Sequence, residues 1–186
     1  MDNVDNIKQY IRRVIDVLEH LDCGMINKAI HLIKDTKDKG GRVYICGNGG
    51  SAATASHMAN DFNKVSCTLD VKYDFICLSD NIPTIMAIAN DDCYENVFLK
   101  QIENKLKVND ILIAISGSGN SENIIRAVKY AKDNGNKVIA FTGFDGGKLR
   151  LLSDISLNAN VNSMQISEDI HVIFNHIMMS TLYNNK

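Results

Sequence analysis

The fold of this chain is decided by one stretch of sequence, Ile45-Cys46-Gly47-Asn48-Gly49-Gly50-Ser51. It ends an apolar run that begins at Val43, breaks at three glycines within four residues, and resumes at Ser51 with small helix-forming residues. This pattern is typical of a strand, a tight loop and the start of a helix. Glycines let the backbone approach an anion closely, and the first amide groups of a helix are free donors. The stretch therefore predicts a phosphate-binding loop, with Ser51 as helix cap and phosphate ligand.

A second loop of the same kind lies further along the chain. A strand predicted over residues 110–115 ends at Ser116-Gly117-Ser118-Gly119-Asn120-Ser121, and a helical pattern over residues 122–132 follows directly. In open parallel sheets, ligands bind beyond the carboxyl ends of the strands, so both loops are expected at one edge. Neither loop carries a Walker lysine or a G-x-G-x-x-G motif with an acidic ribose ligand, which favours a phosphorylated small molecule over a nucleotide.

The other apolar patterns predict an α/β fold in one domain spanning residues 1–186. Continuous apolar strands that alternate with helices indicate a parallel sheet covered on both faces. Residues 1–40 are expected to form an N-terminal helical hairpin, with Asp5 as the first cap, and residues 41–186 the α/β core. Further strands are predicted over residues 73–78, 137–141 and 155–157, and further helices over residues 7–18, 25–33, 82–89, 97–106, 148–152 and 167–182.

Composition narrows the possible partners and the compartment. The chain has 20 basic and 22 acidic residues, so it lacks the basic field that nucleic-acid binding usually needs. Its five cysteines show no C-x-x-C spacing, which is best explained by reduced thiols in a cytoplasm. The acidic, polar N-terminus does not look like an export signal, and no apolar run approaches membrane-spanning length. We therefore expect a cytoplasmic protein that binds small molecules or other proteins.

The two loops belong to a larger set of motifs that resembles a known family. The set comprises residues 46–51 with His57, Asn90-Asp91, residues 116–121, Thr142-Gly143 with Asp145-Gly146-Gly147, and Asp169-Ile170-His171 with His176. It resembles the phosphoheptose isomerases of the sugar isomerase (SIS) fold, over essentially the whole chain. The resemblance implies a three-layer α/β domain with a five-stranded parallel sheet, assembled as a homotetramer with active sites between subunits. It also implies conversion of sedoheptulose 7-phosphate to D-glycero-D-manno-heptose 7-phosphate, which supplies heptose for lipopolysaccharide, capsule or surface-layer glycan.

The resemblance also implies site residues. The substrate contacts of the family fall on Asn48, Gly49, Gly50, Ser51, His57, Asp61, Asn90, Asp91, Ser116, Gly117, Ser118, Ser121 and Glu168. Its metal site, usually zinc, falls on His57, Asp61, Glu168 and His176. This chain departs from the family pattern at three positions: it has Asp61 where the family has glutamate, Glu168 where the family has glutamine, and Gly117 where the family has threonine.

An aldose–ketose isomerase needs a base, an acid and a group that stabilises the developing oxyanion. Asp61 or Glu168 can be the base and His176 the acid or relay, while a divalent metal could polarise the carbonyl. Two imidazoles and two carboxylates suit zinc, but also iron, nickel or manganese. Because Asp61 is one methylene shorter than glutamate, Glu168 could take over the base role.

Two questions stay open at this point. Glu168 and His176 are eight residues apart, about 12 Å along a helix, so one ion contacts both only from between their side chains or from two subunits. The alternative function is a non-catalytic SIS protein that binds a sugar phosphate or a partner, as the DnaA-initiator-associating type does, or an isomerase of another sugar phosphate. The pair His57 and His176, with two carboxylates nearby, favours the enzyme, whereas His171 is expected to be a surface or satisfied core residue and not a ligand.

Overall fold

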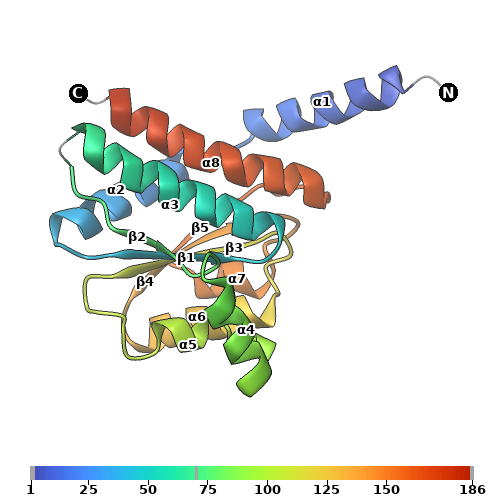
Figure 1. Ribbon diagram of the computed structural model, residues 1–186. Coiled ribbons are helices and arrows are strands. Elements are labelled where there is room, and N and C mark those ends of the chain that lie inside the picture. Colours follow the sequence, from blue (N-terminus) through green and yellow to red (C-terminus); the bar gives the residue numbers. More distant parts are fainter. Residues whose placement is uncertain (1–2, 70, 185–186) are drawn as a thin grey trace.

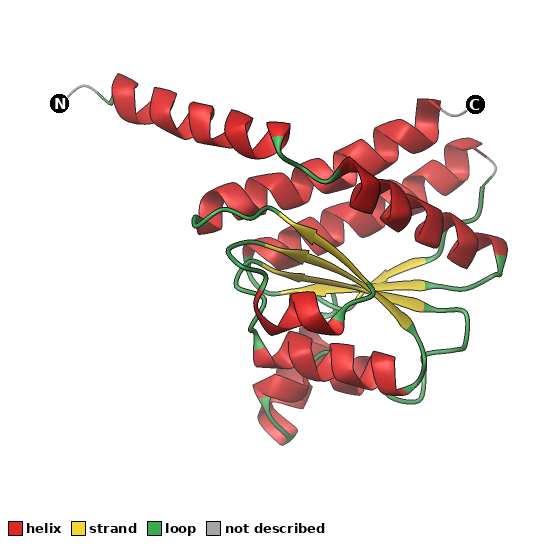
Figure 2. Cartoon of the chain, turned by 180° about the vertical axis from the view of Figure 1, so that it is seen from behind, coloured by secondary structure: helices red, strands yellow, loops and turns green. Residues whose placement is uncertain are grey.

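The computed structural model describes residues 3–69 and 71–184 and has three layers, with helices on both faces of one sheet (Figures 1 and 2). The five strands are all parallel in the order β2-β1-β3-β4-β5. Their bounds are β1 Val43–Gly47, β2 Phe75–Cys77, β3 Ile111–Ser116, β4 Lys137–Thr142 and β5 Ile155–Asn158. The predicted α/β class and the five-stranded parallel sheet are therefore confirmed.

The helices fall into two groups by the face of the sheet that they cover. One group comprises α2 Cys23–Asp38, α3 Gly50–Leu69 and α8 Met164–Asn184, and α1 Val4–Glu19 lies beyond it. The other comprises α4 Ile82–Asp91, α5 Leu99–Ile102, α6 Glu122–Asp133 and α7 Gly147–Leu152, with the short 3₁₀ helix η1 Tyr94–Asn96. Strand β1 is buried on both faces: Val43 and Ile45 pack in the core under α3 and α8, Tyr44 and Cys46 in the core under α6.

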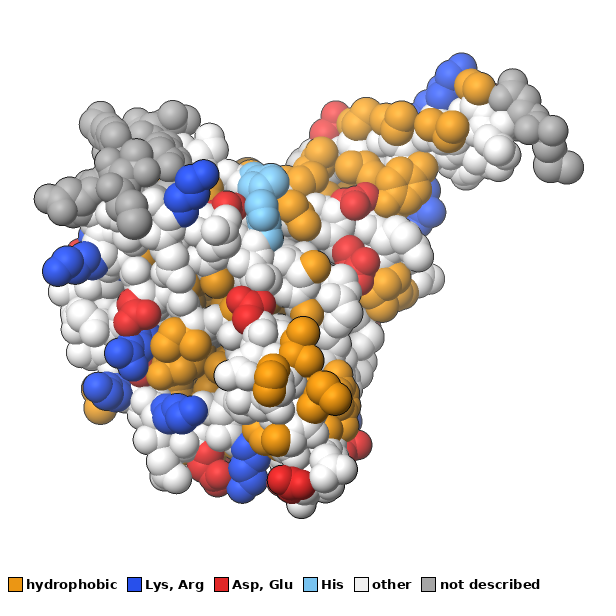
Figure 3. All heavy atoms as spheres, in the orientation of Figure 1, with side chains coloured by type: hydrophobic (Ala, Val, Ile, Leu, Met, Phe, Trp, Pro, Cys, Tyr) orange, Lys and Arg blue, Asp and Glu red, His pale blue; other side chains and the backbone are white. Residues whose placement is uncertain are grey.

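The first two helices form where the sequence predicts them, but they do not fold back on each other as a closed hairpin. Helix α1 projects from the body and packs mainly on α8 (Figures 1 and 2). Its N-cap is Asn3, so the prediction of Asp5 as cap is wrong; Asp5 lies in the first turn. Because α2 turns its apolar face to the core, an apolar stripe on α1 stays exposed (Figure 3). The stripe consists of Val4, Ile7, Tyr10, Ile11, Ile15 and Leu18.

The helix predicted over residues 97–106 is much shorter in the structure. Only Leu99–Ile102 is α-helical, and Asn104 has a left-handed backbone with φ of 60°. The buried Gln101 side chain donates hydrogen bonds to the backbone carbonyls of Leu78 and Val97. The apolar periodicity in this segment therefore marks a packed turn rather than a long helix.

The structure describes the side chains of four of the five cysteines. Cys46 is buried, Cys77 and Cys93 are half-buried, Cys23 is exposed, and all four are free, whereas the Cys67 side chain lies outside the described part. Burial raises the pKa of Cys77 to about 12, so this thiol is unreactive at neutral pH. None of the helices in residues 3–69 and 71–184 is both long and apolar enough to cross a membrane.

Candidate functional site

The first predicted loop joins β1 to α3 as expected. Gly49 has a left-handed φ of 55°, and the carbonyl oxygens of Asn48 and Gly49 accept hydrogen bonds from the amides of Ala52 and Ala53 in the first turn of α3. A side chain at Gly47 would overlap the backbone of Ser51, so only glycine fits there. Ser51 lies inside the first helical turn and is buried, which makes the prediction of Ser51 as the cap wrong.

The second loop lies beside the first, because β3 is the neighbour of β1 in the sheet. The hydroxyl oxygens of Ser116 and Ser121 are 3.2 Å apart across this loop, and Ser121 is the N-cap of α6. The carbonyl of Gly117 accepts a hydrogen bond from the amide of Gly143 at the end of β4. Ser118 lines a cavity of about 660 Å³ beyond these strand ends, together with Asn120, Phe144, Asp145, Asn160, Asn162 and Met164.

Two asparagines connect the loops, and the sequence reasoning assigned a role to only one of them. The side chains of Asn48 and Asn123 exchange two amide hydrogen bonds, each of 2.9 Å, and Tyr94 also donates to Asn48. Asn123 is almost fully buried at the start of α6. Asn48 therefore braces one loop against the other. The sequence signal that could have indicated a role for Asn123 is its position just after a Gly/Ser loop.

Asn90 and Asp91 lie at the exposed C-terminal end of α4. The Asn90 amide donates to the Asp91 carboxylate at 2.8 Å. Within the described ranges, neither side chain hydrogen-bonds to a residue of the two loops. Both residues stay predicted substrate contacts.

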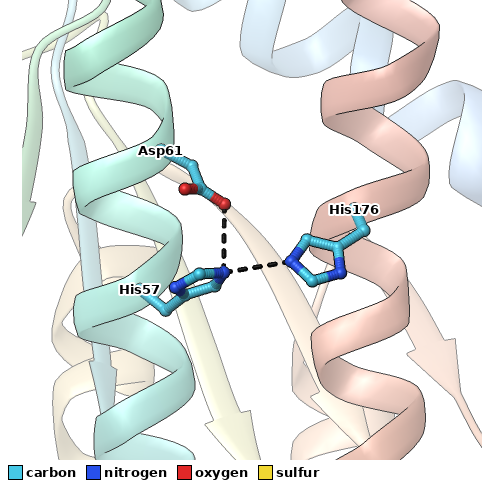
Figure 4. Close-up of side chains that lie close together, drawn as sticks. All are labelled: His57, Asp61 and His176. Atoms are coloured by element: carbon cyan, nitrogen blue, oxygen red, sulfur yellow. Dashed lines mark hydrogen bonds and ion pairs between the residues drawn. The ribbon is translucent and has the colours of Figure 1, made fainter.

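Three of the four predicted metal ligands come together between α3 and α8 (Figure 4). His57 Nε2 lies 3.0 Å from His176 Nε2 and 3.3 Å from Asp61 Oδ2. His57 and Asp61 are four residues apart on α3 and so share one face of the helix. The histidine rings are exposed at the surface, whereas the Asp61 side chain is 22% exposed.

This arrangement fits a metal ion. Zinc takes nitrogen ligands at about 2.0–2.1 Å in a tetrahedral geometry, which sets neighbouring ligand atoms about 3.3 Å apart. The contacts of His57 with its two partners are close to that spacing, and all three ligand atoms lie within 4.8 Å of one another. The cluster could therefore hold a divalent cation with small side-chain adjustments.

Glu168, the fourth predicted metal ligand, lies outside the cluster of His57, Asp61 and His176. A Cβ atom added to Gly50 would come within 2.5–2.7 Å of the Glu168 carboxylate, so that carboxylate lies against the first turn of α3. Since Gly50 is beside Glu168 and His57 beside His176, α3 and α8 run side by side in the same direction. Glu168 is therefore about two helical turns, or 12 Å along the axis, from His176. Within one subunit it contacts the first loop instead of the cluster.

His171, also on α8, is a core residue. It is fully buried beside Phe141 and Phe174, and burial lowers its pKa to about 4.

Asn175 on the same helix was not predicted to take part in the site. Its side-chain amide donates a 2.7 Å hydrogen bond to Asp61 Oδ2. Its position next to a predicted ligand, His176, was the only sequence signal for it.

Comparison with known proteins gives a consistent result. A family model described as SIS domain matches residues 8–143. The chain is 36% identical to the phosphoheptose isomerase of Aliarcobacter butzleri, over 95% of this chain and 92% of that protein, and 35% identical to that of Helicobacter pylori strain P12, over 92% and 87%. The solved phosphoheptose isomerase of Francisella tularensis superposes with a TM-score of 0.89 at 30% identity, covering 97% of both chains. That of Neisseria gonorrhoeae gives a TM-score of 0.88, also at 30% identity, covering 97% and 96%.

Proposed function

This chain belongs to the SIS domain family and, within it, to the phosphoheptose isomerases, and from this premise we propose its reaction and the roles of its residues. It is an aldose–ketose isomerase that converts sedoheptulose 7-phosphate to D-glycero-D-manno-heptose 7-phosphate. The observation that carries this assignment is the 36% identity over 95% of the chain to a phosphoheptose isomerase. The product supplies heptose for a surface polysaccharide, and free thiols agree with a cytoplasmic enzyme.

The substrate phosphate is bound by the two Gly/Ser loops. Ser116, Ser118 and Ser121 supply hydroxyl groups, and the N-terminus of α3 supplies amide groups at the positive end of its dipole. The loops lie at the ends of adjacent strands, so one phosphate group can contact both. Asn90 and Asp91 are further substrate contacts, at the end of α4.

Glu168 is the better candidate for the base that moves the proton between the two carbons. The Asp61 carboxylate already contacts Asn175 and His57 through Oδ2. The structure records no hydrogen bond to the Glu168 carboxylate from any described residue, and this group lies beside the loop. A carboxylate free of partners can accept the carbon-bound proton and return it to the neighbouring carbon. His176 can exchange a proton with the substrate oxygen.

His57, Asp61 and His176 would hold a zinc ion. When bound there, zinc supplies Lewis acidity that polarises the substrate carbonyl and stabilises negative charge on its oxygen. The support for this role is the spacing of the three ligand atoms and the donor set of two imidazoles and one carboxylate. Glu168 would join them only through a second subunit or after its side chain extends along α8.

We further propose that the chain works as a homotetramer. The exposed apolar stripe on α1 is the support, because six large apolar side chains on one projecting helix are rarely left in water. A second copy that covers this stripe would also bring its own loops and helices near the site.

The test is an assay of the purified protein with sedoheptulose 7-phosphate, following aldose formation by NMR. It is run as isolated, after chelation, and after zinc is added back. We expect activity that falls on chelation and returns with zinc, and a Glu168→Gln variant that keeps zinc but loses about 10²–10⁴-fold in rate. Activity indifferent to chelation would contradict the metal role alone. Binding of the sugar phosphate without conversion would contradict the isomerase and favour a binding protein.

A further inference from the structure

Asn175 is a buried polar side chain, and its hydrogen-bond partner is the predicted metal ligand Asp61. It is 0% exposed on α8, and its Nδ2 donates to Asp61 Oδ2 across the gap to α3. Its Oδ1 is also buried and finds no hydrogen-bond partner among the described residues. Phe174 and Met178, which are buried beside it on α8, are apolar.

An asparagine in this place needs an explanation, because half of its amide is left unsatisfied in the core. A buried carbonyl without a partner destabilises a fold, whereas a leucine of similar size would pack there without that cost. The contact with Asp61 is therefore the feature that the asparagine provides and an apolar residue cannot. We therefore consider how this hydrogen bond affects the Asp61 carboxylate.

The hydrogen bond fixes one carboxylate oxygen of Asp61. Oδ2 is contacted by the Asn175 amide at 2.7 Å and by His57 Nε2 at 3.3 Å. An amide N–H can only donate, so this bond fixes the direction in which Oδ2 faces. Because Asp61 has a short side chain, a single bond from a rigid, buried donor is enough to set its orientation.

The same helix supplies both parts of this arrangement. Asn175 and His176 are consecutive, and one helical step of about 100° turns the first toward the core and the second toward the surface. A shift of α8 would therefore move the ligand His176 and the donor Asn175 together.

We propose that Asn175 is a positioning residue that holds the Asp61 carboxylate as a metal ligand and keeps it out of the base role. The inference rests on the metal role given under the proposed function. It differs from a purely structural role, in which the Asn175–Asp61 bond only joins α3 to α8. Such a bond would affect stability and leave metal affinity unchanged.

The experiment measures zinc affinity of the full-length protein by competition with a zinc-binding dye, alongside thermal unfolding of the metal-free form. Asn175→Leu should weaken zinc binding by about 10–100-fold, the range seen when a partner behind a ligand is lost. Its unfolding temperature should change little, because the lost hydrogen bond is offset by removal of the unsatisfied carbonyl. Asn175→Ala is the second variant, and the absorption spectrum of bound cobalt reports whether the ligand geometry has changed.

A matched control is Asn136→Leu, the same substitution at another buried asparagine. Asn136 donates to the backbone carbonyls of Lys107 and Asp110, far from the metal cluster. It should lose stability and keep zinc affinity, the opposite of Asn175→Leu.

The dependence on Asp61 is tested by combining variants. In an Asp61→Ala background, Asn175→Leu should cause no further loss of zinc affinity, because its effect passes through the missing carboxylate. Unchanged zinc affinity and an unchanged cobalt spectrum in both Asn175 variants would overturn the positioning role alone. A wild-type protein that binds no zinc would overturn the metal role and this inference with it.

Discussion

The Nε2 atoms of His57 and His176 face each other at 3.0 Å, although the two residues are 119 positions apart in the chain. Their contact depends on the packing of α3 against α8 over the sheet. One of the two nitrogens must be the donor and the other the acceptor, unless both turn their lone pairs to a cation. The pair is therefore a contact that a metal ion would replace with two coordinate bonds.

The first prediction concerns this pair. His57→Ala and His176→Ala should each weaken zinc binding by at least about 100-fold, more than the loss expected for a residue behind a ligand. Isomerase activity should fall in parallel. Dye competition and the NMR assay measure the two effects. His31→Ala is the control, since His31 is an exposed histidine on α2, outside the cluster, and its loss should change neither quantity.

The second prediction uses Gly50 to move Glu168. A methyl group at Gly50 would lie 2.5–2.7 Å from the Glu168 carboxylate, which is the free end of a flexible side chain and can shift away. Gly50→Ala should therefore fold with nearly wild-type stability but lose about 10-fold or more in kcat, because a base displaced by about 1 Å is misaligned. Zinc affinity should not change.

Gly135→Ala is the control for this experiment. Gly135 has a left-handed φ of 79° with open space around it, between α6 and β4 and away from the site. Alanine there should lower the unfolding temperature through backbone strain and keep kcat. Wild-type kcat in Gly50→Ala would show that the position of the Glu168 carboxylate against α3 does not matter for catalysis.

These residues also show how far the sequence predicts the structure. The apolar runs and glycine loops were sufficient for the five strands, because a parallel sheet buried on both faces leaves a strong local pattern. The predicted cap Ser51 lies two residues beyond the N-cap position of α3, since helix boundaries depend on loop geometry that composition does not reveal. Asn175 gave no signal beyond its position next to His176. Its role depends on a contact with Asp61, 114 residues away, that only packing of the two helices creates.

The third prediction concerns the pH dependence of stability. Burial lowers the pKa of His171 to about 4 from 6.5, and both ring nitrogens are buried without a hydrogen-bond partner among the described residues. Between these pH values the unfolded chain binds a proton that the folded chain does not, so the free energy of unfolding falls as the pH drops. The loss from pH 7 to pH 5 should be about 2 kcal/mol.

Urea unfolding at pH 7 and pH 5 measures this loss. His171→Leu should remove about 2 kcal/mol of the difference between the two pH values, whatever its effect on stability at pH 7. His31→Ala should retain the full difference, because His31 is exposed. An equal pH dependence in wild type and His171→Leu would mean that other groups account for the acid sensitivity.

The last prediction concerns the exposed stripe on α1. If a second copy covers it, a charge in its middle should dissociate the assembly, since an uncompensated buried carboxylate is costly. Ile11→Asp should therefore reduce the mass measured by light scattering from four chains to fewer, and lower the activity. Gln9→Asp adds the same charge to the same helix off the stripe and should leave the mass unchanged. A wild-type protein that is monomeric at micromolar concentration would contradict the homotetramer, and the stripe would then need another partner.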